Sequence, residues 1–397
     1  MPINKVNFSA GSEDLSDIYI SKYQAEEMAY NGTLSEDVFS KEFIDEYFRN
    51  TLWAWGENLS GRVGDNTSTN RSSPVLIGGA GISGDWKFIS ASANYHAISI
   101  KFDGSMWAWG TGAYGRLGLN SVINRSSPTQ IGALKDWKVV SSAGASSIAI
   151  KNDNTMWSWG FNDAGSLGLN NAIERSSPTQ INGTDWLILP NAGTNAAIKI
   201  NGTLWMWGAN TFGRLGRNDT IDRSSPSQVG SGAWRSVTLG SAHTLAINST
   251  GELWAWGYNG VGSLGLNDIS HRSSPTQVGT DSWKMISSNL VHSLGIKSDG
   301  TLWAWGAGAR GRLGLGDVLN RSSPTQVGTL NDWFKVSAGR THTLAIKTDG
   351  TLWAWGENFA GNLGDNTITN RSSPVLIGAA TDWRNISAGL HSSMATR

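Results

Sequence analysis

Residues 351–356 read Thr-Leu-Trp-Ala-Trp-Gly, and copies of the Trp-x-Trp-Gly run occur seven times along the chain at intervals of 54, 50, 48, 49, 49 and 50 residues. The pairs are Trp53/Trp55, Trp107/Trp109, Trp157/Trp159, Trp205/Trp207, Trp254/Trp256, Trp303/Trp305 and Trp353/Trp355. The remaining tryptophans occupy a single later position of each unit: Trp86, Trp137, Trp186, Trp234, Trp283, Trp333 and Trp383. Self-similarity with this period indicates a repeat architecture. Because the repeat accounts for all 21 tryptophans, core packing explains them better than sugar stacking or light absorption.

Each unit reads as short strands joined by tight turns. In the unit around residues 333–356, Asp349-Gly350 separates two alternating apolar runs, a pattern that predicts a hairpin with a type I′ turn. A glycine-rich loop then leads to an Arg-Ser-Ser-Pro box, whose following residues, 375–377 in this unit, suit an edge strand. Each unit therefore supplies about four antiparallel strands.

The two ends of the repeat region predict a closed ring. Residues 51–78 and 351–378 are identical at 23 of 28 positions, whereas an open solenoid needs atypical end repeats. The chain stops at Arg397, just before the position of the Asp-Gly turn, and the repeats begin just after that position. We therefore expect residues 382–396 and 51–78 to form one blade together, with Met394 close to Trp53.

The repeat resembles that of the regulator of chromosome condensation family. The resemblance rests on Leu-Trp-Ala-Trp-Gly-x-Asn-x-x-Gly-x-Leu-Gly, then Arg-Ser-Ser-Pro, then Ser-Ala-Gly-x-x-His-Thr, and it covers residues 49–397. It implies an all-β fold, a seven-bladed β-propeller of four-stranded antiparallel blades closed by pairing of its N- and C-terminal segments. The compact repeats are most similar to bacterial and bacteriophage versions.

Composition and charge narrow the possible partners. The chain has no cysteine and a net charge of zero, with −7 on residues 1–48 and +7 on the remainder. No basic run occurs in the repeats, so nucleic acid is not expected as a partner. We find no run of 18 apolar residues and no signal peptide at the N-terminus. The location is left open between a virion and the cytoplasm.

Residues 1–48 share nothing with the repeats and read as a separate acidic tail, with the propeller domain at residues 49–397. Residues 35–48 have the apolar spacing of an amphipathic helix, with Ser35 placed to cap it. This helix either plugs the propeller or docks on a partner, in which case the tail also offers a route to oligomers. The docking residues would be Phe39, Phe43, Ile44, Tyr47 and Phe48.

Histidines and carboxylates give no catalytic pattern. His96, His243, His292, His342 and His391 share one repeat position, but equivalent positions in different blades lie too far apart to share a metal ion. We interpret them as structural, bonding neighbouring backbone, whereas His271 has no evident partner. Asp65-Asn66 and Asp365-Asn366 read as turn chemistry. No nucleophile motif or phosphate loop is present, so we expect neither an enzyme nor a metal or cofactor.

Arginines occupy two repeat positions. Those before Ser-Ser-Pro, such as Arg371, are expected to bind loop carbonyls. The Gly-x-x-Gly loops carry arginine in some units and serine or asparagine in others, with aromatic residues nearby, a mixture typical of interfaces. The candidate partner-binding residues are Arg62, Arg116, Arg214, Arg312, Tyr114, Phe212, Tyr258 and Phe359.

Three functions follow as hypotheses. The leading one is a non-catalytic structural propeller, a bacteriophage virion component attached through residues 1–48, for which the family resemblance is the support. The second is a glycan-binding propeller, since repeated weak sites give avidity. The third is a guanine-nucleotide exchange factor, which the family implies but which needs a projecting wedge that the even repeat spacing does not provide.

Overall fold

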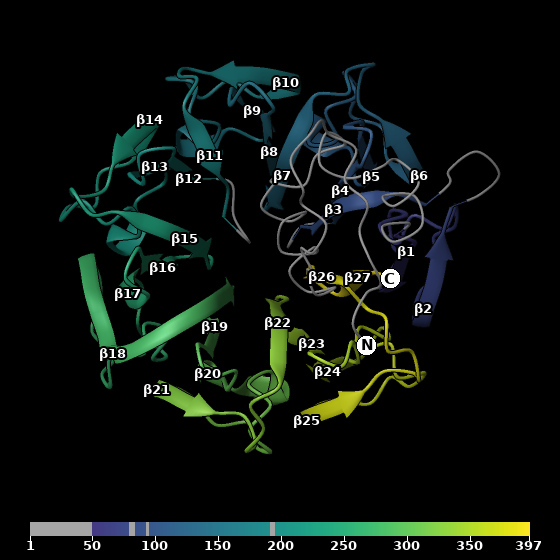
Figure 1. Cartoon of the computed structure of the whole chain (residues 1–397). Helices are drawn as coiled ribbons and strands as arrows, with labels where there is room; N and C mark the ends of the chain where they lie inside the picture. The colour runs from purple at the N-terminus through teal and green to yellow at the C-terminus, as the bar shows by residue number, and fades with distance from the viewer. Residues whose placement is uncertain (1–49, 79–83, 93–94, 191–194) are drawn as a thin grey trace, which may run out of the picture.

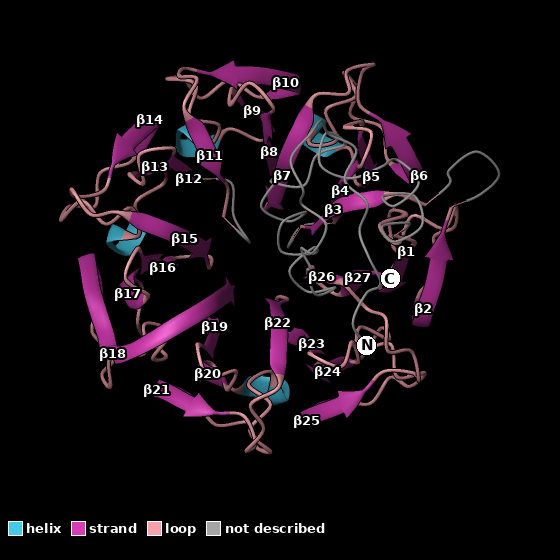
Figure 2. Ribbon diagram, in the orientation of Figure 1, coloured by secondary structure: helices cyan, strands magenta, loops and turns pink. Residues whose placement is uncertain are grey.

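The protein is a ring of antiparallel blades around a central axis, as Figure 1 shows for the computed structural model. The strands form five four-stranded sheets and one seven-stranded sheet, in which two blades share a strand, so the ring has seven blades. The structure describes residues 50–78, 84–92, 95–190 and 195–397, so the predicted helix of residues 35–48 and its docking residues lie outside the described part. Strands and irregular loops make up the described residues, with only single turns of 3-10 helix between them (Figure 2). The all-β propeller expected from the repeats is confirmed.

Each blade has four strands, and we number the blades in chain order. Blade 1 comprises β3 (Trp86–Ala91), β4 (His96–Lys101), β5 (Met106–Gly110) and β6 (Arg125–Gln130), with η1 (Ala113–Gly115) before the last strand. Blade 2 comprises β7 (Trp137–Ala143), β8 (Ser146–Lys151), β9 (Met156–Gly160), η2 (Asp163–Gly165) and β10 (Arg175–Ile181). Blade 3 comprises β11 (Trp186–Ile188), β12 (Ala196–Lys199), β13 (Leu204–Gly208), η3 (Thr211–Gly213) and β14 (Arg223–Gln228).

The next blades share a strand. Blade 4 comprises β15 (Trp234–Leu239), β16 (His243–Asn248), β17 (Glu252–Gly257) and the first part of β18 (Arg272–Asn289). The rest of β18 is the first strand of blade 5, followed by β19 (His292–Lys297), β20 (Leu302–Gly306), η4 (Ala309–Gly311) and β21 (Arg321–Gln326). Blade 6 comprises β22 (Trp333–Ala338), β23 (His342–Lys347), β24 (Leu352–Gly356) and β25 (Arg371–Leu376).

Blade 7 joins the two ends of the repeat region, as the sequence predicts. Its strands are β26 (Asn385–Ala388), β27 (Ser392–Thr396), β1 (Leu52–Gly56) and β2 (Arg71–Ile77), hydrogen-bonded in that order. Strand β27 pairs with β1 in antiparallel register, which places Met394 opposite Ala54 and Ala395 opposite Trp53. In Figure 1 the C-terminal strands lie beside the start of the propeller. The chain therefore closes its own ring.

The core lies between blades rather than within them. Between blades 5 and 6, Leu294 and Leu302 pack with Val336 and Trp355, and all four side chains are buried. In blade 6, Trp333 packs edge to face against both members of the next Trp-x-Trp pair. Its ring centroid lies 6.1 Å from those of Trp353 and Trp355, at interplanar angles of 75° and 68°. Large indoles on one face of each sheet thus fill the gap to the neighbouring blade.

The Gly-x-x-Gly step is explained by close contact between blades. Gly115 and Gly118 have φ of +72° and +71°, where only glycine avoids a steric penalty. A Cβ on Gly115 would lie 2.3 Å from Ser176 Cα of the next blade, and one on Gly118 would lie 2.8 Å from Trp159 Nε1. Both glycines therefore allow one blade's loop to approach the next blade's backbone and indole.

One sequence prediction is wrong in detail. The Asp-Gly hairpins are not type I′ turns, because only the glycine has positive φ, as at Gly104 with +77°. The N–H of Gly104 donates to Lys101 O at 3.0 Å, which makes a type I turn followed by a glycine bulge. Asp103 stays in an ordinary conformation because its Oδ1 accepts hydrogen bonds from the backbone N–H and the hydroxyl of Ser105, at 2.9 and 2.6 Å.

Candidate functional site

The two faces of the ring are built from different connections. His243 pairs with Gly257, so the turn between the first two strands of blade 4 lies at the same end as the loop after its third strand. The short Asp-Gly type turns lie at the opposite end. We call these ends the loop face and the turn face, and the same register in the other blades gives the whole ring two distinct faces.

On the turn face of five blades, a lysine lies over the two indoles nearest to it. Lys347 Nζ is 5.1 Å from the Trp333 ring and 4.7 Å from the Trp353 ring, and it pairs with Asp332 at 3.2 Å. The other lysines with this arrangement are Lys101, Lys151, Lys199 and Lys297, and Arg397 takes the place in blade 7. Blade 4 has Asn248 instead. Sequence reasoning missed this motif, although a lysine ends the second strand of most units.

Three of the equivalent histidines on the loop face, His96, His243 and His342, join neighbouring blades. His342 Nε2 lies 2.9 Å from Ser393 Oγ, and this hydroxyl donates to Asn362 O at 2.7 Å, so the imidazole must donate through Nε2. His96 and His243 bond Ser147 and Ser293 in the same way. Burial lowers the pKa of His243 to about 4 and, with help from His391, that of His342 to about 3. The interpretation as structural histidines agrees with this geometry, with a serine hydroxyl in place of the expected backbone partner.

The arginines of the Gly-x-x-Gly loops turn inward. Arg62, Arg116 and Arg312 are 3, 5 and 6% exposed, and burial lowers the pKa of each. The side chains of Arg116 and Arg312 donate to Ala113 O and Ala309 O of their own loops, both at 2.9 Å.

Arg62 pairs with Glu57 at 3.0 Å and lies 4.1 Å above the Tyr95 ring of the next blade. Arg214, which is half-buried, donates from Nε to Ala209 O at 2.6 Å and from Nη1 to Ser241 O. These guanidinium groups stabilise the loops from within and present little surface to a partner.

The aromatic candidates lie outward on the same face and pair across blade boundaries. The Tyr114 ring is 4.8 Å from Phe161 of the next blade, and the Phe212 ring is 5.1 Å from Tyr258. The Phe359 ring is 4.8 Å from His391. These contacts leave Tyr114, Phe212 and Phe359 exposed at 46, 40 and 52%, while Tyr258 is half-buried.

Charged residues take the aromatic positions near blades 5 to 7. Arg310, at the loop position of Tyr114 and Phe212, pairs with the buried Glu357 of the next blade. His391 Nδ1 lies 3.7 Å from Glu357 Oε2. Burial and the charges of Arg62, Arg340 and Arg310 lower the pKa of His391 to about 4. Arg340, on the turn between β22 and β23, is exposed.

The arginines before Ser-Ser-Pro are structural. They bind aspartate side chains as well as the expected loop carbonyls. Arg223 pairs with Asp219 at 2.8 Å and also donates to Ile221 O at 2.7 Å. The same pairing with an aspartate occurs at Arg71, Arg272, Arg321 and Arg371. Asp65 also accepts from Thr67 N–H at 3.1 Å, and its neighbour Asn66 has φ of +62°, as expected for turn chemistry.

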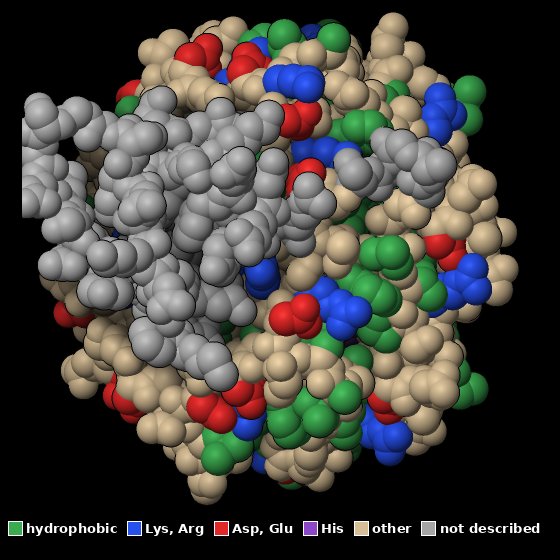
Figure 3. Space-filling model, turned by 45° about the vertical axis from the view of Figure 1, so that its right-hand side comes forward, with side chains coloured by type: hydrophobic (Ala, Val, Ile, Leu, Met, Phe, Trp, Pro, Cys, Tyr) green, Lys and Arg blue, Asp and Glu red, His purple; other side chains and the backbone are tan. Residues whose placement is uncertain are grey.

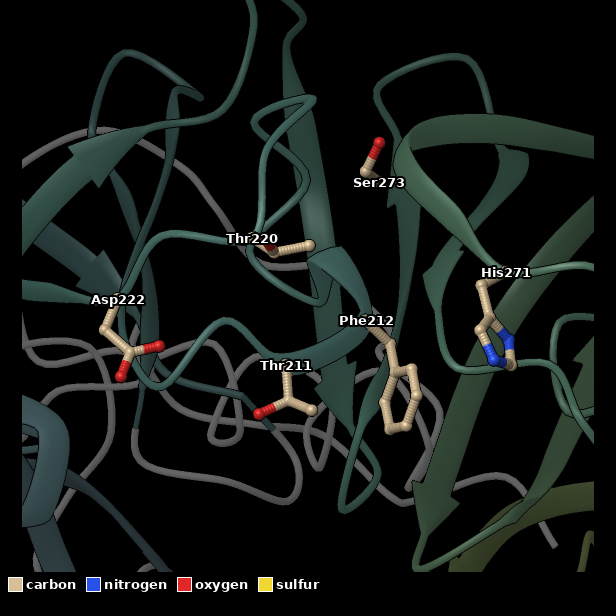
Figure 4. A pocket seen from close by; sticks show the side chains of 6 residues that line it. All are labelled: Thr211, Phe212, Thr220, Asp222, His271 and Ser273. Atoms are coloured by element: carbon tan, nitrogen blue, oxygen red, sulfur yellow. The ribbon is translucent and has the colours of Figure 1, made fainter.

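A recess of about 600 Å³ lies between the long loops of blades 3 and 4. It is lined by Thr211, Phe212, Thr220, Asp222, His271 and Ser273, and Figure 4 shows Thr211 and Phe212 between Asp222 on one side and His271 on the other. The prediction that His271 has no evident partner is wrong: its Nδ1 accepts the Asn259 N–H at 3.0 Å, and its ring lies 4.7 Å from Phe212. These residues come from loops of two neighbouring blades and meet only in the folded ring, so the sequence pattern could not show the recess.

Within the described residues, no three His, Cys, Asp or Glu side chains are grouped so that they could hold a metal ion. Acidic and basic side chains are interspersed on the face shown in Figure 3, without a single-sign patch on its described part. Across the described ranges, no helix is long and apolar enough to span a membrane.

The sequence model of the regulator of chromosome condensation (RCC1) repeat matches six segments of the chain. The matched residues are 103–150, 153–187, 201–247, 250–291, 299–346 and 349–396. They include strands of all seven blades and more than half of the chain. The family resemblance of the repeats is thereby confirmed.

Curated relatives match over single stretches of about two repeats. The mitochondrial RCC1 domain-containing protein RUG3 of Arabidopsis thaliana is 32% identical over 89 residues, which cover 22% of this chain and 20% of that protein. The E3 ubiquitin-protein ligase HERC2 of Homo sapiens is 33% identical over 92 residues, 22% of this chain and 2% of that protein. The ultraviolet-B receptor UVR8 of Arabidopsis thaliana is 31% identical over 84 residues, 21% of this chain and 18% of that protein. The matches thus span at most a fifth of these relatives.

Solved structures with the same fold cover nearly the whole chain. Yeast RCC1 (Prp20) bound to Kap60 superimposes with a TM-score of 0.78 at 17% identity, covering 88% of both chains. Prp20p of Saccharomyces cerevisiae, described with its binding to Gsp1p and histones, gives 0.77 at 18% identity over 91% of this chain and 95% of that one. Human WBSCR16 gives 0.77 at 17% identity over 87% and 98%. At these identities the likeness concerns the fold alone.

Proposed function

This chain belongs to the regulator of chromosome condensation (RCC1) repeat family, and from that premise we propose that it is a non-catalytic interaction propeller that binds a protein partner through its loop face. The observation that carries this proposal is the contrast between a constant frame and variable loop positions. The residue after each Trp-Gly step is Glu57, Thr111, Phe161, Ala209, Tyr258, Ala307 or Glu357, whereas the Arg-Ser-Ser-Pro box is the same in every unit.

The chemistry of the loop face suits a protein partner. Its exposed aromatic residues, Tyr95, Tyr114 and Phe359, are of the type that anchors protein interfaces, and Arg340 adds an exposed guanidinium. The turn face instead repeats lysine–indole contacts that are satisfied within the blades. A protein with this fold binds proteins: yeast Prp20 has been described bound to Kap60 and with binding to Gsp1p and histones. For this chain we propose only the same class of partner, a protein.

A pair of matched variants tests the loop face. Other blades carry alanine at these two loop positions: Ala164 at the position of Tyr114 and Ala113 at the position of Phe359. Tyr114→Ala and Phe359→Ala should therefore preserve the loop backbone. Lys135→Ser is the control on the turn face, where the lysine is exposed and pairs only with the exposed Asp103. Partners are captured with the full chain, purified and titrated against each variant. We expect the loop-face double variant to lose at least tenfold in affinity and the control to keep it. Equal loss in both would contradict the proposal.

For the acidic segment, residues 1–48, we propose attachment to a larger assembly, with a bacteriophage particle as the candidate. Its net charge of −7 and its apolar residues Phe39, Phe43, Ile44, Tyr47 and Phe48 support a docking role. The solution mass of the full chain, beside a chain that starts at Arg49, is the test. Self-association of the full chain alone indicates that the segment assembles copies, and two monomers direct the search to a foreign partner. Acceleration of nucleotide release from a GTPase would instead favour the exchange-factor alternative.

A further inference from the structure

In the recess between blades 3 and 4, the two side chains that cap the loops, Asp222 and His271, each have a second polar atom that can bind a ligand. In six units, the residue before the Arg-Ser-Ser-Pro box accepts a hydrogen bond from a backbone N–H of its own loop. Asparagine Oδ1 does this at Asn70, Asn124, Asn320 and Asn370. In the recess, Asp222 Oδ1 accepts from Asn210 N at 2.7 Å, and His271 Nδ1 accepts from Asn259 N at 3.0 Å.

These two caps fix what each side chain offers to a ligand. Because His271 Nδ1 accepts a backbone hydrogen, the neutral ring carries its proton on Nε2, which is a donor. Asp222 has one oxygen engaged with Asn210, and its second oxygen remains an acceptor. Both residues are exposed, and the hydroxyls of Thr211, Thr220 and Ser273 line the same recess. The site thus presents donors and acceptors together.

An aromatic wall completes the recess. Phe212 is 40% exposed and is held by two rings of blade 4, 5.1 Å from Tyr258 and 4.7 Å from His271. Tyr258 and His271 lie 5.0 Å apart with their planes 32° from parallel. Phe212 also has φ of +61°, an unfavourable conformation for a bulky residue. The loop thus holds an aromatic ring outward in a fixed place (Figure 4).

We propose that this recess binds a neutral sugar ring, stacked on Phe212, with Asp222 accepting from its hydroxyls and His271 Nε2 donating to them. A polyhydroxylated ring needs donors and acceptors side by side beside an apolar face, and this is what the six residues supply. A volume of about 600 Å³ suits one or two sugar units.

Other ligand classes fit the recess less well. A phosphate or carboxylate would meet Asp222, while the nearby Arg223 is paired with Asp219 at 2.8 Å and Arg217 donates to Gln228 O. An amine would be satisfied by the carboxylate and the ring but would leave the His271 donor without a partner. An amine is therefore the rival that the experiment must exclude.

The site occurs at one blade boundary among those described. Blades 2, 4 and 5 carry Ala164, Val261 and Arg310 at the position of Phe212, and no other cap is a histidine. Because a single open site contacts one side of a ring, we expect about millimolar affinity for one sugar, raised by multivalent display. The proposal does not depend on the protein-binding role of Tyr114, Phe359 and Arg340, and loss of either function leaves the other intact.

The test measures binding to the full chain. Binding of a panel of methyl hexopyranosides is detected by saturation-transfer NMR, and immobilised glycans test multivalent binding. Asp222→Asn and His271→Asn introduce the asparagine that caps this loop in four other blades, and Phe212→Ala copies Ala164, so each variant retains its loop. Asn320→His is the matched control, because it adds an imidazole cap at a boundary where Val261 replaces the phenylalanine.

We expect binding of at least one sugar, at least tenfold weaker in each of the three recess variants and unchanged in Asn320→His. Unfolding midpoints near that of the parent chain would show that the loss is local. The proposal is overturned if no sugar binds at about 10 mM, if the recess variants bind as well as the parent, or if Asn320→His loses binding equally. It is also overturned if methylamine or a lysine peptide binds at the recess and the sugars do not.

Discussion

The backbone N–H of Asn366 donates to the carbonyl of Ser72 at 2.8 Å, which joins two residues 294 positions apart in the chain. It is one of seven equivalent bonds, one across each blade boundary. The others run from Asn66, Asn120, Asn170, Asn218, Asn267 and Gly316 to Ser126, Ser176, Ser224, Ser273, Ser322 and Ser372. The second indole of each Trp-x-Trp pair adds another bond across the boundary, as from Trp55 Nε1 to Asn362 O at 2.9 Å. The boundary at the chain ends is therefore built like the other six.

Circular permutation should be neutral because the ends already complete a blade. Thr51 N–H donates to Arg397 O at 2.8 Å, so the two residues flank the position of the missing turn. A chain of residues 51–397 with Arg397 joined to Thr51 by Thr-Asp-Gly, in which the glycine takes the place of Asn50, and opened between Asp299 and Gly300, should fold with the same unfolding midpoint as the linear chain. Circular dichroism and urea unfolding followed by tryptophan fluorescence provide the measurement.

Removal of the closing strand is the opposing experiment. Without residues 392–397, β1 and β26 both lose the strand between them, and two sheet edges become exposed. We expect this chain to lose cooperative unfolding or to aggregate. If it unfolds like the parent, closure by β27 contributes little to stability.

The repeats made the fold predictable, because seven copies in register define the strand order, the closure and the inter-blade core. Residues outside the shared pattern were harder to interpret. The sequence placed Arg116 and Arg312 in variable loops, but it could not show that their guanidinium groups turn back onto their own carbonyls. His271 was missed for the same reason, since its capping role is filled elsewhere by asparagine. The type of hairpin turn was also predicted wrongly. An Asp-Gly pair is compatible with a type I′ turn and with a type I turn followed by a glycine bulge, and the side chain of Asp103 selects the second.

Alanine substitutions at two glycines should distinguish the stability cost of a steric clash from that of a left-handed backbone conformation. Gly350 and Gly378 have φ of +78° and +66°, but a Cβ on Gly350 would lie 2.1 Å from Thr381 O, whereas none of the atoms around Gly378 would come within 4 Å. Gly378→Ala should cost about 1 kcal/mol for the left-handed backbone. Gly350→Ala should cost at least about 2 kcal/mol more, because backbone must move. Equal unfolding midpoints for the two variants would refute the close-contact explanation.

The buried histidines should make stability depend on pH. His243 and His342 are neutral in the fold, with pKa values lowered to about 4 and about 3, whereas in the unfolded chain the ordinary value is about 6.5. The unfolded state therefore binds more protons as pH falls below 6.5, and the free energy of unfolding should decrease from there towards pH 4.

The variant His342→Ser, which copies Ser146 of blade 2, tests the source of this dependence. It should be less stable than the parent at pH 7 because it lacks the bond to Ser393. The gap between the two should narrow as pH falls from 7 to 4, since the variant has one such histidine fewer. Urea unfolding at each pH measures it, and a gap that stays constant over this range would rule out His342 as the titrating group.

Blade 4 offers a gain-of-stability test of the lysine–indole motif. Trp234 and Trp254 lie 6.2 Å apart, as in the other blades, but Asn248 stands where lysine lies elsewhere. Lysine at this site would place its ammonium group over both rings and near Glu252, which Asn248 already contacts at 2.6 Å. We expect Asn248→Lys to stabilise the propeller by about 0.5–1 kcal/mol. Lys347→Met, which keeps an apolar stem and removes the charge, should destabilise it by a similar amount or more, because Asp332 loses its partner. Opposite shifts of the urea midpoint would confirm the motif, and a neutral Lys347→Met would show that the lysine stem alone, through packing, accounts for its place between the indoles.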